Sequence, residues 1–303
     1  MADAASTETM SRPRRRFAGI VPERLRYYRP LRWPWEVVLL ALCLWVYNMV
    51  RNAAPEKVGT AMGHAHDVQA LQDRLHVSFE LSLNRFVADH EPVAQVMNYY
   101  YATLHFVVTI AVLVWLFRVH PRRYSGVRTV LFVASMVALV GFWLYPLAPP
   151  RLAQMGYVDT LKAFHTWGSF ATPEVADHSN QYAAMPSLHT AWALWCGLAL
   201  VVCARRTWVR VLGALYPVVT VVVIVGTANH FVLDAVAGAA VLGVGFLAQY
   251  LLSGQSAFRQ APLRPADVDG PSAGIEIPDF VERGEPAERQ GSASLETGVS
   301  SSS

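Results

Sequence analysis

Three short polar clusters interrupt the long apolar runs of this 303-residue chain, at residues 145–151, 184–189 and 229–234. Together they contain two His, one Asp, one Ser and one Arg that could act on a single chemical group. Ionisable groups inside or beside apolar spans are costly, so each cluster is a candidate functional site. This set of residues suits the binding and cleavage of a phosphate ester.

The cluster that opens the last apolar run holds Asn229, His230 and Asp234. Residues four apart share a helix face, so the Asp234 carboxyl can accept a hydrogen bond from one ring nitrogen of His230. This bond fixes the tautomer and leaves the other nitrogen free to attack. The alternative is a purely structural His–Asp pair.

The second cluster, at residues 184–189, contains Pro186, Ser187 and His189. Proline suits the first turn of a helix, and the Ser187 hydroxyl with the free backbone amides predicts an anion site at that helix start. His189 follows one turn into the helix, where an isolated His is more often structural.

The first cluster, Tyr-Pro-Leu-Ala-Pro-Pro-Arg at 145–151, closes the third apolar run. Its prolines end the helix and leave Arg151 at the interface. A guanidinium presents a planar fork of donors that fits phosphate oxygens. On its own, the cluster is equally typical of an arginine that marks a helix end.

Composition indicates which elements must position these clusters. Hydrophobic residues make up 53% of the chain and charged residues 16%, against roughly 25% charged in soluble domains. A spanning helix takes about 20 apolar residues, and six segments meet or approach that length. We therefore expect an all-α polytopic membrane protein whose domain, residues 33–252, is a six-transmembrane-helix bundle. The expected spans are 33–50, 93–117, 130–147, 184–204, 211–228 and 231–252.

The basic residues of the short links fall on one side of this bundle. They gather before the first span, between spans two and three, and between spans four and five. The positive-inside rule then predicts a cell-membrane protein with both termini in the cytoplasm. It also places all three polar clusters at the outward face, each at a helix end, where their side chains can converge.

Three further segments flank or interrupt the spans. Residues 1–32 form a basic arm, expected to set orientation or to touch anionic lipid headgroups. Residues 51–91 carry apolar side chains at helical spacing, among them Val68, Leu71 and Leu75. This pattern predicts short interfacial helices within about 60–90, or else an ordinary packed loop. Residues 253–303 are expected to be a disordered cytoplasmic tail. The net charge of +3 does not indicate a nucleic-acid partner, the three cysteines show no metal spacing, and nothing indicates an oligomeric state.

These motifs resemble those of the type 2 phosphatidic acid phosphatase superfamily. The resemblance rests on Pro-Ser-Leu-His at 186–189 and His-x-x-x-Asp at 230–234, and covers roughly residues 60–250. The Tyr-Pro-x-x-Pro-Pro-Arg segment, Asn229 before His230, the 71–80 stretch, and the pair Tyr101 and His105 are similar to the bacterial inositol phosphorylceramide synthase-like branch.

The resemblance implies a six-helix fold and a metal-independent phosphatase or phosphotransferase without a cofactor. His230 would form a phospho-histidine intermediate, Asp234 would orient it, and His189 would act as general acid and then base. Arg151 and Ser187 would hold the phosphate of a lipid substrate, with Tyr101, His105 and Asn229 in the binding site. Inositol-phospholipid transfer is one form of this reaction.

The chain also departs from the broader superfamily. Leu144 and Ile224 stand where that superfamily carries a Lys and an Arg, and His105 is a candidate to replace part of their function. A catalytically inactive family member would explain the loss, although His189, His230 and Asp234 are all present. A transporter with a His/Asp proton relay would instead need polar residues along its spans, whereas these cluster at one face.

Overall fold

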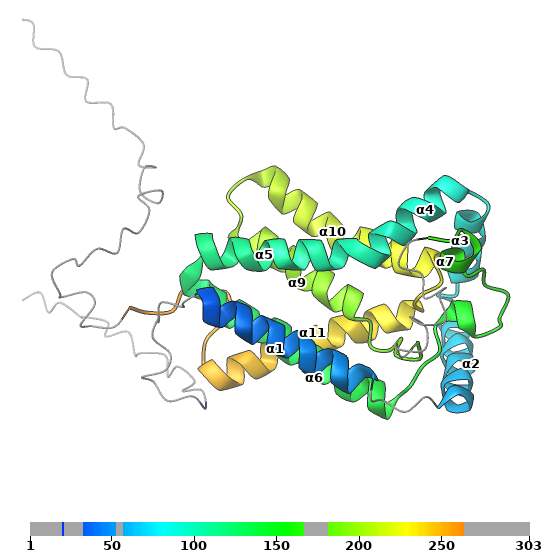
Figure 1. Cartoon of the computed structure of the whole chain (residues 1–303), viewed down its shortest axis with the longest axis horizontal. Coiled ribbons are helices and arrows are strands. Elements are labelled where there is room, and N and C mark those ends of the chain that lie inside the picture. Colours follow the sequence, from blue (N-terminus) through cyan, green and yellow to red (C-terminus); the bar gives the residue numbers. More distant parts are fainter. Residues whose placement is uncertain (1–19, 21–32, 53–56, 167–180, 264–303) are drawn as a thin grey trace, which may run out of the picture. The chain divides into compact units, whose positions relative to one another are not determined.

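The computed structural model describes residues 20, 33–52, 57–166 and 181–263. Nearly all of the basic arm, and most of the tail that is predicted to be disordered, lie outside the described residues. The described part is helical, with no named strand and one isolated bridge between Leu147 and Ala183. The helices are α1 Trp33–Asn52, α2 Val58–Leu75, α3 Glu80–Ala88, α4 Glu91–Tyr99, η2 Tyr100–Leu104, α5 His105–Val119, α6 Pro121–Leu144, η3 Pro150–Leu152, α7 Thr160–Ala163, α9 Leu188–Cys203, α10 Thr207–Gly226 and α11 Val232–Ser253 (Figure 1).

Five of the described helical segments are long and apolar enough to cross a membrane. They are α1, the continuous run formed by α4, η2 and α5, and the separate helices α6, α10 and α11. The predicted fourth span is shorter than expected, because residues 184–187 are not helical and α9 has 16 residues. The expected six long spans are therefore five long helices and one short apolar helix.

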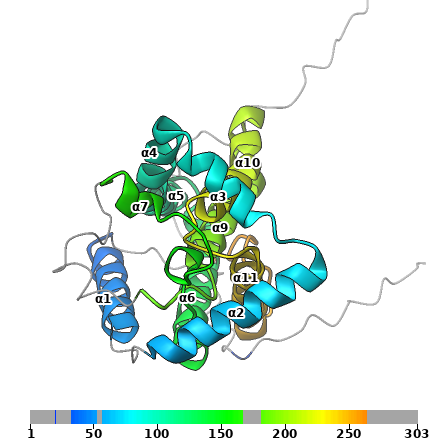
Figure 2. The ribbon, with the colours of Figure 1, turned by 90° about the vertical axis from the view of Figure 1, so that its right-hand side faces the viewer.

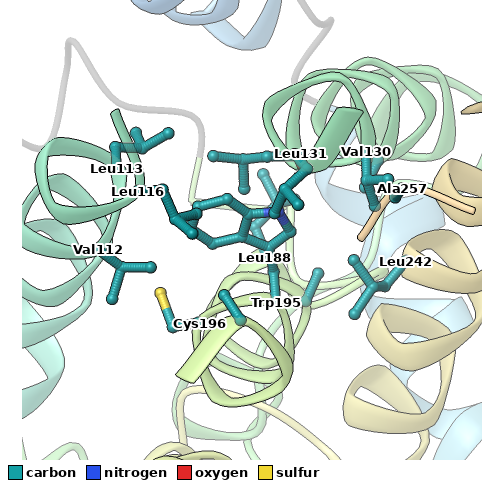
Figure 3. Packing of buried hydrophobic residues seen from close by; sticks show 14 of the residues in the cluster. Val112, Leu113, Leu116, Val130, Leu131, Leu188, Trp195, Cys196, Leu242 and Ala257 are labelled. Carbon is teal, nitrogen blue, oxygen red and sulfur yellow. The ribbon is translucent and has the colours of Figure 1, made fainter. Parts of the chain in front are cut away.

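The short helix α9 lies in the middle of the bundle, with α5, α6, α10 and α11 around it (Figure 2). Trp195 and Cys196 of α9 are fully buried, and the Trp195 indole donates a hydrogen bond to the Val127 carbonyl at 2.8 Å. Figure 3 shows Trp195 at the centre of an apolar cluster built by several helices. Because α9 is central, other helices cover most of its surface. This explains how a 16-residue helix fits among longer ones.

Two glycines allow the helices around α9 to approach closely. A Cβ on Gly197 would lie 2.5 Å from the Gly213 carbonyl oxygen of α10, and one on Gly238 of α11 would lie 2.3 Å from the Ser187 carbonyl oxygen. Small residues at such crossings are typical of helix packing in membranes. The Gly238 contact brings the starts of α9 and α11 together.

The links that carry most of the described arginines lie together at one end of the bundle, which we call the basic end. Arg122, in the first turn of α6, donates to the Ala261 carbonyl after α11, and Arg123 contacts the Cys203 sulfur at the end of α9. Arg128 of α6 pairs with Glu36 of α1 nearby. These contacts agree with the predicted clustering of basic links on one side.

Between α1 and α4, the segment predicted to form short helices contains α2 and α3. The buried stripe of α2 is Ala61, Ala65, Val68 and Gln72, rather than the predicted repeat of Val68, Leu71 and Leu75. Leu71 and Leu75 are exposed. The side of α2 that packs on the rest of the chain therefore carries mostly small residues and one amide, that of Gln72.

Candidate active site

A cavity of about 370 Å³ lies where α9 and α11 begin. Six of the eight predicted site residues line it: Tyr101, His105, Arg151, His189, Asn229 and His230. Residues of η2, α5, η3, α9 and the turn before α11 therefore line one volume. Asp234 and Ser187 lie behind this lining.

His230 is held by Asp234 from one turn further along the chain. The His230 Nδ1 atom lies 3.3 Å from Asp234 Oδ2, and the carboxyl group is fully buried. Since a carboxylate oxygen accepts, Nδ1 carries the proton and Nε2 keeps its lone pair. Asp234 Oδ2 also accepts from the Phe231 backbone N–H at 2.9 Å, so one carboxyl oxygen fixes both the imidazole and the turn that precedes α11.

His189 faces His230 across the cavity, with 5.5 Å between the ring centroids. Its ring is stacked on Tyr101 at 4.4 Å and meets His105 edge-on at 4.3 Å. The predicted acid–base residue is therefore held in orientation by aromatic neighbours from the second long helix.

Tyr101 and His105 come from a stretch where the α4–α5 helix widens into a π-helical turn, η2. The His105 Nδ1 atom lies 3.0 Å from the Tyr101 carbonyl oxygen, an acceptor only, so Nδ1 is the donor. π-helical turns are frequent at functional sites, and this one was not predicted from the sequence. Its effect is to bring both side chains to the cavity.

Arg151 is the one Arg or Lys among the described residues that line the cavity. Its Nε donates to Asn229 Oδ1 at 3.0 Å and its Nη1 to Asp159 Oδ2 at 3.1 Å. A guanidinium has five N–H donors, so these two bonds aim the fork and leave further donors for a phosphate. Asn229 donates in turn to Thr227, and thus the structure gives it a direct task in holding Arg151.

Ser187 occupies the N-cap position of α9 and is fully buried. Its hydroxyl accepts a hydrogen bond from the Thr190 backbone N–H at 3.4 Å, and its own N–H donates to the Asp234 carbonyl. The helix therefore begins at Leu188, after Pro186 rather than at it, so His189 lies in the first turn, and the Ser187 hydroxyl does not line the cavity.

Two residues that bind the first amides of α11, just after His230, were not predicted from the sequence. Gln72 of α2 and Glu80 of α3 are both fully buried. Glu80 Oε1 accepts from the Val232 N–H at 3.2 Å, and Gln72 Oε1 from the Leu233 N–H at 3.0 Å. The first amides of a helix have no partner within the helix, and these side chains supply one. This explains why the buried stripe of α2 ends in an amide.

Helix α2 also fixes the loop that carries Arg151. The His64 imidazole stacks on Tyr145 at 4.0 Å and bonds the Pro146 carbonyl at 2.8 Å. The Ala61 carbonyl accepts from the Ala148 N–H. The α2–α3 segment is therefore part of the site's framework.

Tyr157, in the loop after Arg151, donates a hydrogen bond to Gln69 of α2. Burial, followed by the negative charges of Glu80 and Asp73, raises the pKa of the Tyr157 phenol. The phenol therefore stays neutral and remains a donor. By contrast, hydrogen bonds from Ser78 and Gln69 lower the pKa of Asp73 on the exposed side of the same helix.

The two positions that depart from the broader family contribute no polar group to the cavity. Leu144 is 77% exposed at the end of α6, and Ile224 is buried in α10. The Ile224 carbonyl accepts the Asn229 and His230 N–H groups, so this position shapes the turn before His230 through its backbone. Across the described ranges, no group of three or more His, Cys, Asp or Glu has an arrangement able to hold a metal ion.

Comparison with known proteins gives one match. The sequence model of the PAP2 superfamily matches residues 66–248, a range that includes every residue of the cavity except those contributed by α1. No curated protein and no solved structure matches the chain.

Proposed function

Because this chain belongs to the PAP2 superfamily, we propose that it cleaves a phosphate ester of a membrane lipid through a covalent phosphate on His230. Superfamily membership supports phosphatase-type chemistry on lipid phosphates. The observation that carries the finer proposal is the His230–Asp234 bond, with His189 and Arg151 lining the same cavity.

In the first step, Arg151 holds the phosphate oxygens and the His230 Nε2 lone pair attacks phosphorus. The bond from phosphorus to the lipid alcohol breaks, and protonated His189 gives its proton to the leaving oxygen. Asp234 stabilises the imidazolium formed at His230, because its carboxyl already bonds Nδ1.

In the second step, a hydroxyl group attacks the phosphorus of the phospho-histidine. Neutral His189 takes the proton of that hydroxyl, the P–N bond breaks, and His230 regains its lone pair. Water gives free phosphate and therefore a phosphatase. A polyol or lipid hydroxyl gives a new phosphate ester, and the likeness to the inositol phosphorylceramide synthase branch favours this transfer.

We further propose that the chain crosses the cell membrane six times, with α9 as the short central span. Sixteen residues at about 1.5 Å each give roughly 24 Å, less than the roughly 30 Å hydrocarbon core. The non-helical segment before α9 and the surrounding helices make up the difference. The basic end would face the cytoplasm, and the cavity the outer side.

Turnover of phosphatidate by purified protein tests the proposal, beside His230→Ala and with or without a metal chelator. We expect chelator-resistant activity that His230→Ala abolishes, and an acid-labile phosphate label on the wild-type protein. Adding inositol as acceptor separates transfer, which gives inositol phosphate, from hydrolysis, which gives free phosphate. Activity that survives His230→Ala, or that the chelator removes, would contradict the mechanism.

A further inference from the structure

A second, larger cavity adjoins the first and is almost entirely apolar. Its volume is about 570 Å³, and it lies between α1 and α5, with walls from α6 and Trp192 of α9. We call it the α1–α5 groove. The two cavities adjoin, because four residues line both: Leu44, Tyr47, Phe106 and Trp192.

The groove is built from two facing helical stripes. On α5 its lining follows a spacing of three and four residues from Phe106 to Phe117, and on α1 the same spacing runs from Glu36 to Tyr47. Such a stripe normally packs against a neighbouring helix. Here α1 packs along α6, and much of the lining stays exposed: Ile110 is 59% and Val114 is 47% accessible.

The polarity of the combined volume changes along its length. At one end lie His189, His230 and Arg151; at the other, toward the basic end, the lining includes Glu36, Arg118 and Tyr124. From Phe106 to Phe117 the helix rises about 16 Å, close to the depth of one leaflet's acyl chains in a hydrocarbon core of about 30 Å. One polar head and one apolar tail of leaflet length match this arrangement.

We propose that the α1–α5 groove holds an acyl tail of the lipid whose phosphate ester lies in the His189–His230 cavity. This inference rests on the proposed function and specifies its substrate class as acyl-lipid phosphates. The groove does not draw the tail from the bilayer, because both surroundings are equally apolar. It aligns the tail, and so presents the phosphate end to His230 and Arg151 in one orientation.

A bulky residue deep in the groove tests this arrangement. Val114 lies about 12 Å from Phe106 along α5, beyond the reach of a four-carbon tail but within that of an oleoyl tail. Val114→Trp should lower kcat/KM for dioleoyl phosphatidate about tenfold or more and leave dibutyryl phosphatidate unchanged. The matched control is Val107→Trp on the same helix, because Val107 is 59% exposed and does not line the groove.

Photocrosslinking gives a readout that does not depend on turnover. Full-length His230→Ala protein in nanodiscs is labelled with phosphatidate that carries a diazirine near the tail end. We expect label on the groove faces of α1 and α5, lost on competition with dioleoyl phosphatidate and retained with dioleoylglycerol.

The outcomes separate the two proposals. If the wild-type protein turns over neither substrate while the groove is still labelled, only the catalytic proposal is contradicted. Label spread evenly over the outer faces of α5 and α10, or equal effects of Val114→Trp on short and long tails, overturns the groove assignment. Equal turnover and equal Val114→Trp sensitivity of a polyprenyl phosphate overturns the acyl-lipid class.

Discussion

The helices that begin at the cavity, α9 and α11, start in opposite ways. Helix α9 is capped locally, because the Ser187 hydroxyl accepts the N–H of a residue three positions later. Helix α11 is capped from a distance, because Glu80 and Gln72 accept the N–H groups of residues 152 and 161 positions away. The start of α9 is thus capped from within its own segment, whereas the first amides of α11 depend on α2 and α3.

The largest effect is expected at Asp234, which lies in the first turn of α11 and holds His230. Asp234→Asn keeps an oxygen that can accept from the Phe231 N–H, so the turn is retained. It removes the anion that fixes the His230 tautomer, and kcat should fall by a factor on the order of 10³–10⁴, as in comparable His–Asp systems. Steady-state kinetics and a melting curve measure both properties. A melting temperature that falls as sharply as kcat would mean that Asp234 acts mainly on the fold.

A substitution that pushes the starts of α9 and α11 apart should have the next largest effect. In Gly238→Ala the new Cβ would lie 2.3 Å from the Ser187 carbonyl oxygen, and overpacking of this kind costs about 1–3 kcal/mol. Activity should fall because the His189 and His230 segments separate. Gly243→Ala is the matched control on the same helix, since nothing lies within 4 Å of its Cβ. Equal behaviour of the two variants in thermal unfolding and turnover would show that the contact does not matter.

Removing one distant cap tests the comparison directly. Glu80→Ala leaves the partly buried Val232 N–H without its acceptor, which costs about 1–3 kcal/mol of stability, and kcat should fall about tenfold or more. Glu80→Gln keeps an acceptor oxygen and should recover most of that loss. The control is Glu91→Ala, at an exposed helix start. Failure of Glu80→Gln to recover activity would mean that the charge of Glu80, rather than its cap, is required.

The local cap should matter least for catalysis. Ser187→Ala should cost about 0.5–2 kcal/mol of stability, the usual value of an N-cap, with kcat nearly unchanged. Unfolding and turnover measured on one preparation separate these effects. A large fall in kcat with unchanged stability would instead show that the hydroxyl contacts the phosphate, the role implied by the family resemblance.

This difference also explains what the sequence could predict. The Pro-Ser-Leu-His and His-x-x-x-Asp motifs are local, so a helix start could be predicted at each, to within one residue for α11 and four residues too early for α9. The predicted site residues His189, His230 and Arg151 line one cavity. Gln72 and Glu80 could not, because no local pattern marks a side chain that caps a helix more than 150 positions away. Their nearest signal was their place in the 71–80 stretch that resembles the bacterial branch.

Other departures have similar physical origins. The fourth span is short because its helix begins only at Leu188, and its central position makes that length sufficient. Asn229 could be placed beside Arg151 only once the loop after α6 was known to return to the α10–α11 turn. The π-helical turn has no sequence signature among Tyr, Ala, Thr and Leu.

The π-helical turn η2 shifts the angular phase of α5 relative to α4 within one long helix. A π turn holds one residue more than an α turn, and one residue corresponds to about 100° of rotation. Residues before Tyr100 and after Leu104 therefore follow different angular frames, although the axis is continuous. Loss of one residue inside the turn would restore an ordinary α turn and leave the groove stripe on α5 in nearly the same direction relative to α4. Loss of one residue elsewhere in α4 or α5 would instead rotate that stripe by about 100°. One residue can consequently be gained or lost at this turn with less change in the direction of α5 than elsewhere along the helix.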